Sequence, residues 1–169
     1  MSGRTRAAVV GVGYLGRFHT EKWVATPGAE LVAVVDTDAE RARELAARFG
    51  CRALTDGREL RGLVDCASVG VPTPLHREVG VGLLEAGIDV LVEKPIAATL
   101  DEARELVRVA EACGRILQVG HLERFNPAIS ALGELLTRPR FLECHRLAPF
   151  VERGTDVGVV LDLMIHDLD

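Results

Sequence analysis

The chain has no lysine- or arginine-rich block and no long apolar run. Its 20 Lys and Arg residues are outnumbered by 25 Asp and Glu residues, for a formal net charge of -5. That balance argues against nucleic-acid binding, which rewards a concentrated basic face. No apolar run approaches the roughly 20 residues that span a bilayer. We therefore expect a cytoplasmic protein with neither nucleic acid nor a membrane as its partner.

Cysteines are few and far apart in the sequence. The chain has four, Cys51, Cys66, Cys113 and Cys144, with no Cys-x-x-Cys pair and no histidine at zinc spacing. We expect free, mostly buried thiols and no metal. The composition, 48% hydrophobic and 27% charged, is that of a folded chain rather than a disordered one.

Short apolar runs alternate with amphipathic stretches, a pattern typical of a parallel sheet covered by helices on both faces. We predict strands at residues 7–12, 30–35, 51–54, 63–69, 89–92 and 116–119. We predict helices at residues 14–25, 39–48, 75–86 and from 100 to about 113. Asp38 and Thr99 are the expected N-caps, and Gly80 and Gly82 weaken the third helix. The prediction is an α/β, doubly wound Rossmann domain over residues 1–120.

Residues 121–169 change in character. A helix is expected from Asn126-Pro127 to about residue 136, a strand at 141–147 and an amphipathic helix at 157–169. We predict that this segment is the incomplete start of a second α/β domain.

A glycine motif follows the first predicted strand. Gly11 is expected to make a tight turn, Gly13 to let the backbone approach a pyrophosphate, and Gly16 to let the helix pack closely on its strand. Asp36 ends the next apolar run, where a carboxylate accepts hydrogen bonds from ribose and repels a 2′-phosphate. The motif predicts NAD, with NADP disfavoured. An ordinary glycine turn is the alternative, because the chain has 17 glycines.

Glu93-Lys94-Pro95 follows the fifth predicted strand, at the edge of the sheet where open α/β proteins bind ligands. The Lys94 ammonium can donate a proton or a hydrogen bond to a reacting oxygen. Pro95 restricts the backbone beside it, and a cis peptide bond there is one option. The alternative is a solvated lysine that pairs with Glu93.

Further polar residues lie beyond this edge. Asp162 and His166 are four residues apart, which places them on one face of a helix, where a carboxylate can orient a histidine that exchanges protons. The alternative is a helix face turned to water. The loops at 72–76 and 120–127 leave the same edge of the sheet, although turn chemistry alone also explains them. His19 is expected to be a helix-packing residue.

Taken together, these segments resemble the Gfo/Idh/MocA family of NAD(P)-dependent oxidoreductases. The resemblance rests on residues 11–16, Asp36, residues 73–76, 93–95 and 124–127, and Asp162-x-x-x-His166-Asp167. It implies hydride transfer from a sugar or cyclitol hydroxyl carbon. It places the catalytic groups at Lys94, Asp162 and His166. The implied cofactor contacts are Gly11, Gly13, Tyr14, Leu15, Gly16, Asp36, Thr73, His76, Glu93 and Lys94, and the implied substrate contacts are Lys94, Arg124, Asn126 and His166.

Residues 120–127 and 148–162 are similar to the branch of the family that oxidises the 3-hydroxyl of UDP-N-acetylglucosamine or a related nucleotide sugar. A myo-inositol or simple-sugar dehydrogenase is the second reading. Members of the family continue well beyond the position of Asp169 and are homo-oligomers, so the resemblance implies a truncated chain that binds cofactor better than it turns over substrate. A non-catalytic NAD-binding protein, or a module whose last helix docks on a partner, stays open.

Overall fold

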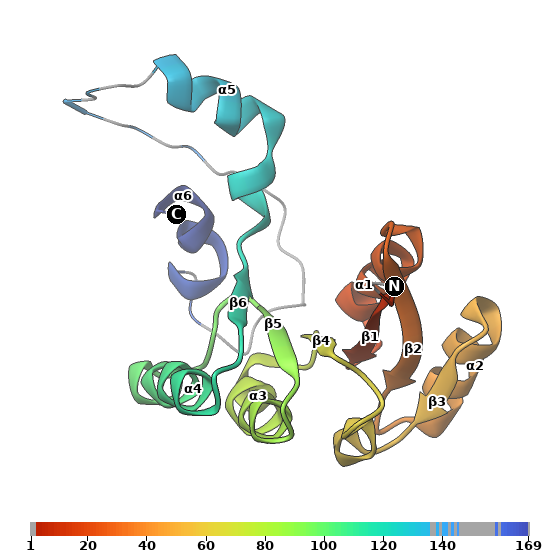
Figure 1. Cartoon of the computed structure of the whole chain (residues 1–169). Coiled ribbons are helices and arrows are strands. Elements are labelled where there is room, and N and C mark those ends of the chain that lie inside the picture. Colours follow the sequence, from red (N-terminus) through yellow and green to blue (C-terminus); the bar gives the residue numbers. More distant parts are fainter. Residues whose placement is uncertain are drawn as a thin grey trace.

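The computed structural model describes residues 3–135, 138, 140, 141, 143, 145, 158 and 160–168. Six parallel strands form one sheet in the order β3-β2-β1-β4-β5-β6 (Figure 1). The strands are β1 (Thr5–Val10), β2 (Ala29–Val35), β3 (Arg52–Leu54), β4 (Cys66–Val69), β5 (Asp89–Glu93) and β6 (Leu117–Gly120). The predicted parallel Rossmann sheet is confirmed.

Helices join the strands and cover both faces of the sheet. The α-helices are α1 (Tyr14–Ala25), α2 (Ala39–Phe49), α3 (His76–Glu85), α4 (Leu100–Cys113), α5 (Pro127–Leu135) and α6 (Ile165–Leu168). Alternate residues of β1 enter different cores, as the period of a strand requires. Val9 packs with Leu45 of α2, whereas Ala8 and Val10 belong to a larger cluster that includes Leu106 of α4. The sheet is therefore buried on both sides.

The helix boundaries follow the capping residues. The Asp38 side chain accepts from the backbone N–H groups of Glu40 and Arg41 at the start of α2. Thr99 and Glu102 form a capping box at the start of α4. Such a cap is worth about 1 kcal/mol. Both predicted N-caps are confirmed.

Two predicted elements are shorter than expected because turns take their first residues. A hydrogen-bonded turn, in which the Leu63 N–H donates to the Leu60 carbonyl, follows the 3-10 helix η1 (Gly57–Leu60), and β4 begins only at Cys66. The third helix begins at His76, after the turn η2 (Thr73–Leu75). Sequence periodicity does not distinguish such turns from the elements that they precede.

Gly80 has a packing role that helix propensity alone does not predict. A Cβ atom at residue 80 would lie 2.7 Å from Cδ2 of the fully buried Leu106. The missing side chain is therefore what lets α3 approach α4. Helix α3 forms in spite of its two glycines because this contact is buried.

The described cysteines, Cys51, Cys66 and Cys113, are free, as predicted. Cys51 and Cys66 are half-buried but Cys113 is exposed, so the expectation of burial is only partly right. Burial raises the pKa of the Cys66 thiol to about 11. Cys144 lies outside the described residues.

Beyond β6 the chain continues through the 3-10 turn η3 (Leu122–Phe125) into α5, and a π-helical turn η4 (Val160–Met164) leads into α6. Residues 160–168 of the predicted last helix are thus helical. The predicted strand at 141–147 lies outside the described residues, except for residues 141, 143 and 145. Within the described part of the chain, no helix combines the length and the apolar character needed to cross a bilayer.

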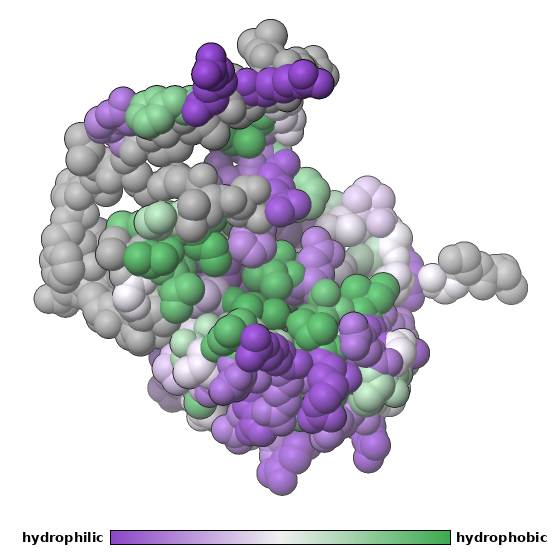
Figure 2. Space-filling view, turned by 90° about the vertical axis from the view of Figure 1, so that its left-hand side faces the viewer, coloured by the Kyte–Doolittle hydropathy of each residue, from purple (hydrophilic) through white to green (hydrophobic). Residues whose placement is uncertain are grey.

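The face that carries α4 and β6 is shown in Figure 2. Apolar side chains gather in the middle of this face, above a strongly polar region. Val107 of α4 and Ile116, next to the edge strand β6, are among the exposed large apolar side chains of these elements.

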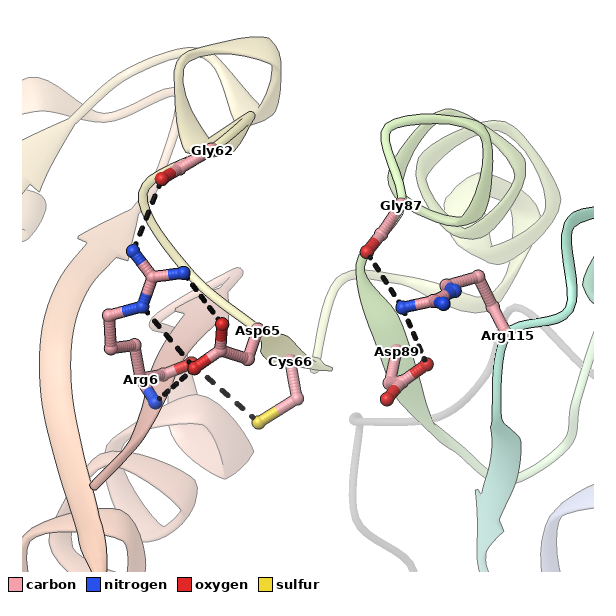
Figure 3. Close-up of polar contacts among 7 residues, drawn as sticks. All are labelled: Arg6, Gly62, Asp65, Cys66, Gly87, Asp89 and Arg115. Carbon is pink, nitrogen blue, oxygen red and sulfur yellow. Dashed lines mark hydrogen bonds and ion pairs between the residues drawn. The ribbon is translucent and has the colours of Figure 1, made fainter. Parts of the chain in front are cut away.

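Ion pairs hold the amino-terminal edge of the sheet, opposite the glycine motif (Figure 3). The Arg6 guanidinium donates to both carboxylate oxygens of Asp65, at 2.6 and 3.3 Å, and to the Gly62 carbonyl. The Arg6 backbone N–H donates to Asp65 as well, at 2.8 Å. Arg115 makes a similar link from the Gly87 carbonyl to Asp89. These links tie β1 to β4 and β6 to β5.

Stability should fall in acid partly through Asp65. The side-chain and backbone hydrogen bonds from Arg6 lower the pKa of Asp65 below its ordinary value. A lowered folded pKa gives stability that is present above about pH 4 and lost as pH falls through the folded pKa. Because the pair is half exposed, we expect Asp65→Asn to cost about 1 kcal/mol at neutral pH. Urea unfolding across pH would show that cost shrinking in acid, and a pH-independent cost would contradict it.

Candidate functional site

The three motif glycines are required for three different reasons. Gly11 has φ +82°, and a Cβ atom there would lie 2.7 Å from the backbone nitrogen of Val71. A Cβ atom at Gly16 would lie 1.9 Å from the carbonyl oxygen of Gly11. A Cβ atom at Gly13 would meet no heavy atom within 4 Å. The fold therefore needs Gly11 and Gly16, whereas it leaves the space beside Gly13 open.

This open space adjoins the amino end of α1. Gly13 is the N-cap and provides no side chain to cap the first turn, and the helical bonds begin with the Arg17 N–H donating to the Gly13 carbonyl at 3.2 Å. First-turn amides and the helix dipole favour an anion at such an end. Tyr14 and Leu15 are exposed there, and Tyr14 packs edge-on against Phe18. This end of α1 fits a diphosphate.

Asp36 lies beside the glycine turn at the end of β2, only 7% exposed. Its Oδ2 accepts from the Val12 N–H at 3.0 Å, and its Oδ1 accepts from the Asp38 N–H at 2.9 Å. Arg41 Nη1 lies 3.2 Å from each carboxylate oxygen. Sequence reasoning missed Arg41, although its place in the first turn of a helix capped by Asp38 was a usable signal. A ribose hydroxyl that reaches Asp36 must share the carboxylate with this guanidinium.

A cleft of about 550 Å3 opens between the start of α1 and one side of α2. That volume is typical of a small-molecule site. Its lining residues are Val12, Gly13, Tyr14, Arg17, Arg41, Glu44, Leu45 and Arg48. The cleft thus joins the open amino end of α1 to the guanidinium that pairs with Asp36.

Glu93, at the end of β5, contacts α1 and is not among the residues that line this cleft. Its Oε1 lies 2.8 Å from Nε2 of His19, and the two side chains are 7% and 15% exposed. Gly120, at the end of β6, leaves room for the carboxylate, because a Cβ atom there would lie 3.0 Å from Oε1. His19 packs in the helix as expected, but sequence reasoning missed its partner.

Lys94 is partly buried directly after β5, and the Lys94–Pro95 peptide bond is cis, which is the option considered from the sequence. The neighbouring Pro95 is contacted by His76, which is 1% exposed. Its Nδ1 lies 2.9 Å from the Pro95 carbonyl oxygen and its Nε2 lies 2.9 Å from the Val71 carbonyl oxygen. His76 joins the loops after β4 and β5.

The other predicted residues are more scattered. Thr73 is buried in η2, and Arg124 is exposed in η3. Asn126 begins α5, where its Oδ1 accepts from the Ala128 N–H at 3.0 Å and its Nδ2 donates to Glu123 at 2.9 Å. Asp162 lies in the π-helical turn η4, and His166 lies in α6, partly buried.

Known proteins resemble the chain over nearly its whole length. UDP-N-acetylglucosamine 3-dehydrogenase from Acidithiobacillus ferrooxidans is 43% identical over 165 residues, which cover 97% of this chain and 52% of that protein. Inositol 2-dehydrogenase from Rubrobacter xylanophilus is 34% identical over 178 residues, which cover 99% of this chain and 51% of that protein. The chain spans about half the length of these curated relatives.

Solved structures agree with this relationship. The Acidithiobacillus ferrooxidans enzyme superposes with a TM-score of 0.90 at 42% identity, over 98% of this chain and 55% of that chain. GenD2 from gentamicin A biosynthesis, solved in complex with NAD, has a TM-score of 0.76 at 34% identity, over 79% of this chain and 39% of that chain. Residues 5–121 match the family described as an oxidoreductase family with an NAD-binding Rossmann fold. The chain therefore belongs to the Gfo/Idh/MocA oxidoreductase family.

Proposed function

We propose that the chain binds NAD at the carboxyl edge of its sheet, with NADP bound more weakly. The observation that carries the proposal is the Asp36 carboxylate, which two backbone amides hold in place beside an open glycine turn. A diphosphate sits at the amino end of α1, and Asp36 accepts from the adenosine ribose. Residues 1–120 are then the cofactor domain, and residues 121–169 begin the substrate domain.

The protein to which the chain belongs is proposed to be a dehydrogenase that acts on a sugar hydroxyl. When bound, NAD supplies the electrophilic nicotinamide carbon that accepts hydride. Lys94 or His166 removes the hydroxyl proton, and Asp162 orients the base. Arg124 and Asn126 contact the substrate. The chain's own contribution is to align the reacting groups and to hold the proton.

The proposed substrate is a UDP-N-acetylhexosamine that is oxidised at its 3-position. The similarity to the Acidithiobacillus ferrooxidans enzyme supports this choice, because its 43% identity is higher than the 34% identity to the Rubrobacter xylanophilus inositol 2-dehydrogenase. The similarity to inositol 2-dehydrogenases supports the second candidate, a cyclitol or simple-sugar substrate.

Calorimetric titration of the chain with NAD and with NADP tests the cofactor. We expect NAD to bind at least about tenfold more tightly, since one hydrogen bond to a charged group is worth about 1.5–3 kcal/mol. Asp36→Ala should remove most of that preference. Arg41→Ala is the matched control, because it removes the partner of Asp36 and should weaken NADP more than NAD. Equal affinities for the two cofactors in the unaltered chain would remove Asp36 from this role.

Thermal unfolding of both variants belongs to the same experiment, because Asp36 also accepts two backbone hydrogen bonds and its replacement can lower stability as well as affinity.

The substrate is tested separately. The NAD-loaded chain is mixed with UDP-N-acetylglucosamine or with myo-inositol, and the absorbance of reduced nicotinamide is followed. We expect faster reduction with the nucleotide sugar. NAD binding without reduction by either compound would favour a non-catalytic NAD-binding protein.

A further inference from the structure

Glu93 is a buried carboxylate that faces a buried imidazole. Its Oε1 lies 2.8 Å from Nε2 of His19, and neither side chain is more than 15% exposed. A carboxylate removed from water is costly unless a partner satisfies it. Glu93 comes from the end of β5 and His19 from α1, 74 residues earlier in the chain. The contact therefore joins the helix of the glycine motif to the strand that leads into Lys94.

The carboxylate of Glu93 packs closely against Gly120, since even a Cβ atom there would lie 3.0 Å from Oε1 and 3.2 Å from Cδ of Glu93. The inward face of α1 is fixed elsewhere too, because the Trp23 indole donates to the Ser68 hydroxyl of β4 at 2.8 Å. Helix α1 is thus anchored to both β4 and β5 by polar contacts. Its position along the sheet is set by these contacts as well as by apolar packing.

Lys94 is held on both sides. The residue before it, Glu93, contacts His19, and the Pro95 carbonyl after it lies 2.9 Å from Nδ1 of His76. The backbone of Lys94 is therefore fixed relative to α1 and to the loop after β4. Displacements of about 1 Å at a reacting group cost on the order of 100-fold in rate.

We propose that His19 and Glu93 are positioning residues that fix Lys94 relative to the amino end of α1. The proposal rests on the proposed function, in which α1 holds the diphosphate and Lys94 lies beside the reacting atoms. Glu93 then acts through the backbone from its contact with His19, in place of the direct cofactor contact that the family resemblance implied. The link keeps the Lys94 amine aligned with the nicotinamide ring of a cofactor whose diphosphate is held at α1.

The sequence offers a sharp probe, because the chain has only two lysines, Lys22 and Lys94. Reductive methylation with 13C-formaldehyde gives NMR signals from these two side chains and from the chain's amino terminus. Lys22 is exposed on α1 and serves as an internal reference. The signals are recorded without ligand and with NAD, for the unaltered chain and for His19→Ala, His19→Gln and Glu93→Gln.

We expect His19→Ala and Glu93→Gln to move the Lys94 signal in the ligand-free chain and to reduce the shift that NAD induces. The Lys22 signal should stay in place, and NAD should still bind. His19→Gln keeps an N–H donor and should restore much of the Lys94 signal. If the pair had only a structural role, the variants would change the melting temperature, and His19→Gln would not restore the Lys94 signal.

The matched control is His145→Ala, which removes an imidazole that also lies 2.8 Å from a glutamate, Glu143, but in an exposed pair. It should leave both lysine signals unchanged. If His19→Ala does not fold, Glu93→Gln provides the test, because a glutamine side chain has nearly the same shape as a glutamate side chain. A Lys94 signal that is identical in the unaltered chain and in Glu93→Gln overturns the proposal. Failure of the unaltered chain to bind NAD overturns the proposed function instead, and the ligand-free signals still decide the pair.

Discussion

Replacing Gly16 with alanine is expected to lower the free energy of unfolding by about 3 kcal/mol or more. The new Cβ atom would lie 1.9 Å from the Gly11 carbonyl oxygen and 2.8 Å from its carbon. Both are backbone atoms of a tight turn, so neither can yield as the end of a flexible side chain can. Folded domains are stable by only about 5–15 kcal/mol, so the loss is large. Urea unfolding followed by circular dichroism measures it.

Gly82→Ala is the control for this prediction. Gly82 also lies within a helix, α3, but a Cβ atom there would meet nothing within 4 Å. Helix propensity alone favours alanine by about 0.5–1 kcal/mol at both positions. We therefore expect Gly82→Ala to stabilise the chain. If the two variants changed stability in the same direction, the close approach of α1 to Gly11 would not be the cause.

Gly13→Ala should do the opposite of Gly16→Ala, weakening NAD binding while sparing the fold. The fold leaves the space beside Gly13 open, so we expect the unfolding free energy to change by less than about 1 kcal/mol. A methyl group there would occupy the place proposed for the diphosphate. The expected rise in the NAD dissociation constant is on the order of 100-fold, or about 2.7 kcal/mol. Calorimetric titration and urea unfolding of the same preparation separate the two effects.

Gly82→Ala again provides the comparison, because α3 contributes none of the lining of the cleft between α1 and α2. Its NAD affinity should match that of the unaltered chain. If Gly13→Ala bound NAD as tightly as Gly82→Ala, the diphosphate would have to lie elsewhere.

The order of strands and helices could be predicted from the sequence because each element carries its own local signal. Parallel strands buried on both faces are short apolar runs, and caps such as Asp38 and Thr99 mark where helices begin. The need for Gly11 and Gly16 follows from a motif in which the spacing itself implies the geometry. These signals all lie within a few residues of the feature that they predict.

The partners of the site residues could not be predicted in this way. His19 contacts Glu93, which lies 74 residues away in the sequence, and no local sequence pattern around either residue indicates the other. The sequence did predict that His19 packs in its helix, but not which residue it contacts. Arg41 was nearer to Asp36, but its contact depends on how the second helix leaves the sheet. Long-range polar pairs depend on the packed arrangement, which periodicity does not encode.

The strand order has a consequence for how the chain becomes able to hold a ligand. β1, the first of the six strands in sequence, lies in the middle of the sheet, and Gly11 lies against Val71, just after the neighbouring strand β4. A partly folded chain therefore lacks the close packing around Gly11 until β4 has been inserted, and it lacks Lys94 at this edge until β5 follows. A dinucleotide that spans Asp36 and Lys94 favours the assembled sheet over every partly folded form by mass action. Protease resistance gained on adding it should extend across these central strands, beyond the glycine turn alone.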